Sequence, residues 1–309
     1  MAEDYPRTLV ELERRFSDDA ACRQYIFSLR WPEGFRCPGC QGQSAWAISR
    51  GLWLCNGCRR QVSVLAGTVF QDTHLPLTVW FRAMWHITSQ KNGMSALGLQ
   101  RVLGLGSYRT AWLILHKLRQ AMVRPSRDRL RGVVEVDEAC WGGTEAKGAV
   151  GRLTYKKTLI AVAAEEDGKG IGRIRMARIP DFDRATLHGF IRSSVEPGST
   201  VCTDGLNSYR ELEGFVHHRG VQLRTEPGEH LLPRVHRAIS LLKRWILGTH
   251  QGAVRSQHLD DYLNEFVFRF NRRKSASRGR LFYRLAQHAV QIAPTTYERL
   301  VHPQDVVHG

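Results

Sequence analysis

The chain has 309 residues, enough for roughly two or three domains and at least one sizeable core. Its 45 Lys and Arg outnumber 29 Asp and Glu, which gives a formal net charge of +16. Arginine suits bidentate contact with phosphate, so this excess favours a polyanionic partner, most simply nucleic acid, over a generally basic surface. The N-terminal residues do not form a signal peptide, and no apolar run approaches the ~18 residues that a membrane span needs.

The first predicted element is helical and covers residues 8–30, with a break at Asp18 and Asp19. It makes up an N-terminal helical segment, residues 1–30. A small zinc ribbon is predicted over residues 31–70, because aromatic and apolar residues between 46 and 54 resemble two short strands.

The ribbon is predicted from four cysteines in the pattern C-x2-C-x14-C-x2-C, namely Cys37, Cys40, Cys55 and Cys58. Two thiolate pairs at this spacing can surround one Zn²⁺ tetrahedrally, and four thiolates leave no open position, so the ion would be structural. The alternative is two disulfides in a secreted domain.

Seven cysteines in total leave Cys22, Cys140 and Cys202 as an odd remainder, which indicates a reducing cytoplasm rather than a secreted protein.

Residues 71–124 are predicted to hold a helix-turn-helix. A helix runs from Pro76 to about Gln90, Ser95 caps a short helix, and Ser107 caps a longer one after a glycine turn at 104–106. Two capped helices with a basic second helix are typical of a DNA reader, although any small helical hairpin has the same pattern. The predicted DNA contacts on the second helix are Arg109, Lys117 and Arg119.

A basic linker at 124–129 leads into an α/β domain predicted over residues 130–295, followed by a tail at 296–309. The predicted strands are 133–137, 158–164, 171–179 and 200–204. The predicted helices are 184–193, 232–247, 257–272 and 281–292.

Two acidic residues stand at strand ends in this domain. Asp137 ends one strand and Asp204 ends another, each close to glycines that let a ligand approach. A lone aspartate in such a place is commonly a turn or cap residue. Two of them in one basic domain favour a site that binds divalent cations together with phosphate.

The helix at 232–247 adds a third candidate ligand. His236 and Lys243 are seven residues, or two turns, apart and lie on the same side of the helix. A metal ligand with a cation two turns on would suit a site that holds metal and DNA phosphate together, although His236 alone could equally be a core or surface histidine. The next helix ends in a basic cluster, which is either a solvated face or a phosphate contact: Arg272, Arg273 and Lys274.

These residues together resemble the bacterial insertion-sequence transposases of the DDE superfamily, in the branch that joins a zinc ribbon to an RNase H-like (ISXO2-like) catalytic domain. The resemblance runs over roughly residues 15–290. It is carried by residues 35–40, Val-Glu-Val-Asp-Glu at 134–138 with Trp-Gly-Gly at 141–143, Thr-Asp-Gly-Leu-Asn-Ser-Tyr at 203–209, His236 with residues 243–250, and residues 262–273.

The resemblance implies that Asp137 and Asp204 are the first two catalytic aspartates. His236 falls in the slot of the third acidic residue, with Lys243 as its basic partner, and imidazole is also a competent ligand for divalent metals. A second departure is Leu241, where relatives often carry Asn. The implied cofactors are two Mg²⁺ or Mn²⁺ ions in addition to one structural Zn²⁺.

The function expected from this resemblance is cutting of element ends and joining of the 3′-OH to target DNA. The expected partners are double-stranded DNA and further copies of the chain on that DNA, with no membrane, in a nucleoid-associated, cytoplasmic protein. Two alternatives remain: a non-catalytic or degenerate DNA-binding regulator, and an RNase H-type nuclease.

Overall fold

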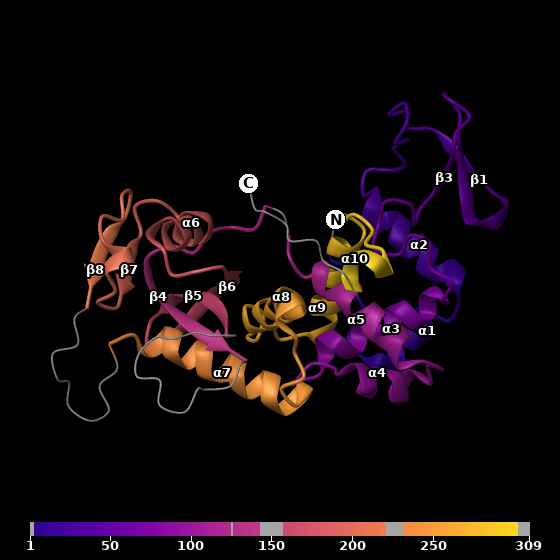
Figure 1. Ribbon diagram of the computed structural model, residues 1–309. Coiled ribbons are helices and arrows are strands. Elements are labelled where there is room, and N and C mark those ends of the chain that lie inside the picture. Colours follow the sequence, from indigo (N-terminus) through magenta and orange to yellow (C-terminus); the bar gives the residue numbers. More distant parts are fainter. Residues whose placement is uncertain (1–2, 125, 143–156, 221–230, 302–309) are drawn as a thin grey trace. The chain divides into compact units, whose positions relative to one another are not determined.

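The computed structural model describes residues 3–124, 126–142, 157–220 and 231–301 (Figure 1). The chain divides into two compact units. The first comprises residues 1–124 and 274–309, and the second comprises residues 125–273. Both helices and sheets are present, which confirms the predicted multidomain α/β class.

The first unit is mainly helical. Its helices are α1 (Leu9–Arg15), α2 (Asp19–Arg30), α3 (Leu77–Ser89), α4 (Ala96–Leu103), α5 (Tyr108–Gln120), α9 (Arg278–Ala289) and α10 (Tyr297–Val301). The predicted caps are present. Ser95 Oγ accepts a hydrogen bond from the Gly98 N–H at 3.0 Å, and Ser107 Oγ accepts one from the Arg109 N–H at 3.2 Å.

Aromatic side chains from distant parts of the chain form the core of this unit. The Phe16 ring lies 4.6 Å from that of Phe81 and 6.1 Å from that of Phe282 on α9, and Tyr25 packs beside them. The domain predicted over 130–295 includes α9, whereas the structure groups α9 with the N-terminal helices. The hairpin of α4 and α5 agrees with the predicted elements, and its assignment as a helix-turn-helix stays a prediction.

The cysteine-rich segment forms a three-stranded antiparallel sheet rather than the two strands expected. Its strands are β1 (Ala45–Ile48), β2 (Leu52–Cys55) and β3 (Gln61–Ser63), with a 3-10 turn, η1 (Ser49–Gly51), between the first two. The third strand is short, so the sequence pattern did not reveal it.

The second unit is built on a five-stranded mixed sheet in the order β6-β5-β4-β7-β8. The strands are β4 (Val133–Trp141), β5 (Thr158–Asp167), β6 (Gly170–Ile179), β7 (Thr200–Thr203) and β8 (Val216–Arg219). β4, β5 and β6 are antiparallel neighbours, and β7 lies parallel to both β4 and β8. The prediction missed β8, which has a polar sequence and lies at the sheet edge.

Helices cover both faces of this sheet (Figure 1). The helices are α6 (Arg184–Ser194), α7 (Pro233–His250) and α8 (Leu259–Phe270), with short 3-10 turns η2 (Asn207–Tyr209) and η3 (Ser256–His258). Side chains of β4 alternate between two cores: Val134 and Val136 pack with α6, while Ala139 packs with α7 and α8. The RNase H-like assignment of this unit stays a prediction.

Within the described part of the chain, none of the helices has the length and apolar character that crossing a bilayer requires.

Candidate metal centre and active site

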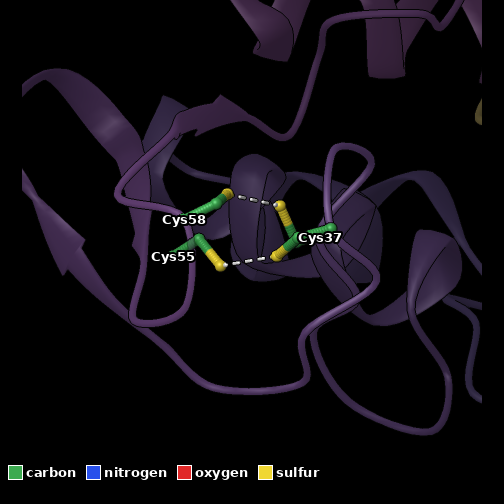
Figure 2. Close-up of side chains that lie close together, drawn as sticks. Cys37, Cys55 and Cys58 are labelled. Atoms are coloured by element: carbon green, nitrogen blue, oxygen red, sulfur yellow. Dashed lines mark hydrogen bonds between the residues drawn. The ribbon is translucent and has the colours of Figure 1, made fainter.

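The four predicted zinc ligands converge in the ribbon. The Sγ atoms of Cys37 and Cys58 are 3.6 Å apart, those of Cys40 and Cys55 are 3.5 Å apart, and all four lie within 4.8 Å of one another (Figure 2). Sulfurs bound tetrahedrally at about 2.3 Å from one Zn²⁺ would be spaced at about 3.8 Å. The donor set and its spacing therefore fit a structural Zn²⁺.

Backbone hydrogen bonds favour the thiolate form of Cys37, one of these four ligands. Hydrogen bonding by the backbone of Cys40, together with the Gly39 N–H, lowers the pKa of the Cys37 thiol. A metal binds the thiolate, so a lowered pKa favours the ligating form near neutral pH.

A second group of polar side chains forms where β4 and β7 end. Glu135 on β4 pairs with Cys202 on β7 in parallel register, so Asp137 comes opposite Asp204 when the register is continued two residues further. Paired residues of neighbouring strands point to the same face. The two predicted aspartates therefore face the same side of the sheet, the side covered by α7.

The loop after β7 fixes the second aspartate. The Leu206 N–H donates to Asp204 Oδ1 at 2.9 Å. The Arg219 guanidinium, on the neighbouring strand β8, donates to the Gly205 carbonyl and to Asn207 Oδ1. These contacts hold the loop that follows Asp204 against β8.

His236 joins the group from the first turn of α7. Its Nε2 atom lies 3.0 Å from Asp137 Oδ2, and 15% of the Asp137 side chain is exposed against 44% for His236. Burial raises the pKa of Asp137, and the negative charge of Asp204 raises it further. Hydrogen bonding with the Glu138 backbone and the proximity of His236 oppose this rise.

The structure thus brings together the three residues that the sequence suggested. Two carboxylates close enough to influence each other's protonation, with an imidazole beside them, are a donor set that Mg²⁺ or Mn²⁺ could use. The ligand atoms of these three residues do not lie as close together as the four cysteine sulfurs. Among the described residues, only the four cysteines place three or more such ligand atoms within 4.8 Å of one another.

Glu135 connects α7 to the sheet, and the sequence analysis did not identify it. Its side chain is 5% exposed. Glu135 Oε2 accepts the backbone N–H groups of Arg234 and Val235 at 2.7 and 2.9 Å, and Oε1 accepts Arg234 Nη1 at 2.9 Å. A carboxylate at a helix N-terminus satisfies free N–H groups and favours the helix dipole.

Arg234 extends this connection to the turn between β5 and β6. It donates to the carbonyls of Gly168 and Gly170, each at 3.1 Å, and forms an ion pair with Glu166 at 3.0 Å. The start of α7 is therefore attached to β4, β5 and β6, which sets His236 beside Asp137. The available signal in the sequence was an acidic residue two positions before Asp137, on the same face of β4.

Lys243 lies two turns along α7 from His236 and is exposed. It is free to reach a ligand that extends from the aspartates along this helix. Its predicted role as a phosphate contact stays a prediction.

The predicted DNA contacts on α5 differ in accessibility. Arg109 is exposed and stacks on the Tyr297 ring of α10, with 3.7 Å from Cζ to the ring centroid. Lys117 is half-buried, which lowers its pKa. Arg119 is only 1% exposed and lies 3.3 Å from the buried ring of His116. A side chain buried to this extent presents no surface to DNA.

The basic cluster after α8 is used largely within the protein. Arg272 stacks on the Phe268 ring at 4.0 Å, and Arg273 stacks on the Phe270 ring at 4.0 Å. Arg273 also donates to the carbonyls of Ile171 and Gly172 on β6.

Lys274 is exposed. Three residues earlier, the Asn271 side chain pairs with Ile174 of β6. Its Oδ1 accepts the Ile174 N–H at 2.8 Å, and its Nδ2 donates to the Ile174 carbonyl at 3.1 Å. Local sequence could not reveal these contacts, because they depend on β6 lying beside the end of α8.

Comparison with known proteins finds a family domain in each part of the chain. Residues 129–271 match the family model of the ISXO2-like transposase domain, and residues 17–61 match that of the transposase zinc-ribbon domain. A relative described as an uncharacterized protein in transposable element ISH50, from Halobacterium salinarum, is 25% identical over 279 residues. The alignment covers 83% of this chain and 92% of that protein.

Proposed function

The chain belongs to the family of insertion-sequence transposases that carry a zinc ribbon and an ISXO2-like domain, and we propose that it cuts DNA at element ends and joins the freed 3′-OH to target DNA. The observation that carries this proposal is that Asp137 lies close enough to Asp204 for their charges to interact, with His236 Nε2 3.0 Å from Asp137 Oδ2.

In the proposed site, Asp137 and Asp204 would hold two divalent ions and His236 would complete the coordination of one of them. Bound Mg²⁺ or Mn²⁺ would supply activation of the attacking oxygen and stabilisation of the leaving oxygen. Glu135 keeps the first turn of α7, and with it His236, in place. Lys243 contacts a phosphate near the bond to be cut, where an exposed cation can balance the charge of the backbone.

The remaining proposed DNA contacts lie in the helical hairpin and after α8. Arg109 and Lys117 would contact the element end from α5, and Lys274 would contact phosphate. Arg272 and Arg273 are also proposed to contact phosphate, although each packs on an aromatic ring of α8 and donates to backbone carbonyls. The protein is proposed to act as an oligomer on double-stranded DNA.

The test is cleavage and joining of labelled DNA that carries the gene's own flanking ends, in Mg²⁺ or Mn²⁺. Wild type is compared with Asp137→Asn and His236→Ala. We expect joined products with the wild type and none with either variant, while both variants still bind DNA. Loss of folding and DNA binding together with cleavage in Asp137→Asn would contradict the catalytic assignment.

Two features favour a second candidate, a DNA-binding regulator without catalytic activity: the resemblance leads us to expect an acidic residue where His236 stands and Asn where Leu241 stands. Binding without joining by the wild type would support it. Cleavage of an RNA–DNA hybrid in preference to element ends would instead support an RNase H-type nuclease.

A further inference from the structure

The exposed face of α7 extends away from the proposed active site as one continuous stripe. At 100° per residue, His236, Lys243 and Leu247 project within about 20° of one direction, and both Arg237 and Arg244 lie on one flank of that line. All five residues are exposed, whereas the opposite face of α7 is buried in the core. The stripe therefore begins at His236, beside Asp137, and ends about 16 Å along the helix, at Leu247.

This stripe has the charge that a nucleic acid requires. The 18 residues of α7 include four Lys and Arg and not a single Asp or Glu. Arg234 is bonded to Glu135 and Glu166, so Arg237, Lys243 and Arg244 are the cations of the exposed stripe. Short side chains at Ser240 and Gly248 leave room for a backbone to approach.

Leu247 is unusual in this setting. It is 59% exposed, the largest value for a large apolar side chain in the described part of the chain. Lys243 and Arg244 are one turn before it. A protein partner that covered Leu247 would also have to bury these two charges, which is costly. DNA would neutralise both charges with phosphates, and the apolar faces of its bases could cover the leucine.

We propose that DNA lies along the α7 stripe as it enters the active site, and that Leu247 inserts between its bases and unstacks them. This inference rests on the proposed function. Leu247 lies about 16 Å from His236 along the helix, and base pairs are stacked about 3.4 Å apart. The insertion therefore falls within about five base pairs of the bond to be cut. Opening the duplex there would free one strand to bend toward Asp137 and Asp204, and Arg237, Lys243 and Arg244 would hold its phosphates.

The first test measures unstacking before any strand is cut. Element ends carrying 2-aminopurine within five base pairs of the cleavage position are bound by the full chain in Ca²⁺. Wild type should raise the fluorescence, and Leu247→Ala should abolish the rise while binding the same DNA. Val10→Ala, which removes a 55% exposed apolar side chain from α1, should behave as wild type. No rise with wild type, or an equal rise with Leu247→Ala, would overturn the proposal.

The second test separates this role from the chemistry. On fully paired ends, Leu247→Ala should join DNA about tenfold more slowly than wild type, and ends with mismatches at the insertion position should restore the rate. Asp137→Asn should be inactive on both substrates, so failure of the proposed function and failure of this inference give different results. A rate defect that mismatches do not rescue, or a change in oligomeric mass with Leu247→Ala, would identify a protein contact and overturn the proposal.

The phosphate contacts are tested by salt dependence. Arg237→Ala and Arg244→Ala should each reduce the slope of log binding constant against log salt by about 1. Arg192→Ala changes an exposed arginine on α6, on the opposite face of the sheet, and should leave the slope unchanged. Equal slopes for all three variants would exclude α7 as the path of the DNA.

Discussion

Replacing Glu135 by Gln should destabilise the second unit, because Glu135 is the buried acceptor that connects α7 to the sheet. Glutamine keeps one oxygen for the backbone N–H groups of Arg234 and Val235. Its amide nitrogen would then face Arg234 Nη1, which now lies 2.9 Å from a carboxylate oxygen. A buried donor is left facing another donor, and the anion at the helix N-terminus is lost.

The magnitude follows from these contacts. A hydrogen bond to a charged group contributes about 1.5–3 kcal/mol, and breaking a buried ion pair costs about 3–5 kcal/mol. Arg234 keeps 21% of its side chain exposed, so the lower part of this range applies, about 3 kcal/mol. For a unit of this size, that corresponds to a fall in Tm of about 6–12 °C.

Calorimetry of the full chain would measure this change, with Arg234→Ala and the double variant completing a thermodynamic cycle. We expect a coupling free energy of at least about 1 kcal/mol between the two positions. Arg237→Ala, at an exposed position three residues after Arg234 on the same helix, is the matched control and should leave the Tm unchanged. A loss below about 1 kcal/mol for Glu135→Gln would refute the idea that this carboxylate holds α7 in place.

Three further changes test other parts of the structure. Asp137→Asn should be more stable than wild type at pH 7, because a raised pKa in the folded state means that the charged form opposes folding; in urea titrations this gain should shrink as the pH falls toward 4. Cys40→Ser should lose the single zinc measured by elemental analysis, whereas Cys22→Ser, at a buried cysteine outside the ribbon, should retain it. Ser95→Ala should cost about 1 kcal/mol in thermal unfolding by removing the cap of α4, and an unchanged Tm would contradict that role.

The features that sequence could predict are those with local causes. Ser95 and Ser107 cap their helices as expected, since a cap depends only on residues within one turn. The zinc ligands follow from spacing alone. Asp137, Asp204 and His236 were suggested by strand ends, helix spacing and family resemblance. The parallel pairing of β4 with β7 brings the two aspartates together, and the contacts of Glu135 with α7 bring His236 to them.

The features that sequence could not predict depend on contacts between distant segments. Arg119 is a basic residue on a helix with a polar face, and only the packing of the first unit shows that it is buried. Glu135 resembles any acidic residue in a strand until α7 is placed over it, about 100 positions later in the chain. The grouping of α9 with α3 likewise required the aromatic core that joins Phe16, Phe81 and Phe282.

The contacts after α8 also protect the sheet from self-association. β6 is an edge strand, and an edge strand with free backbone groups can pair with a strand of another molecule. Asn271 imitates a neighbouring strand by bonding both backbone groups of Ile174, and Arg273 occupies the carbonyls of Ile171 and Gly172. These contacts thus close one edge through which copies of the chain could aggregate as an extended sheet.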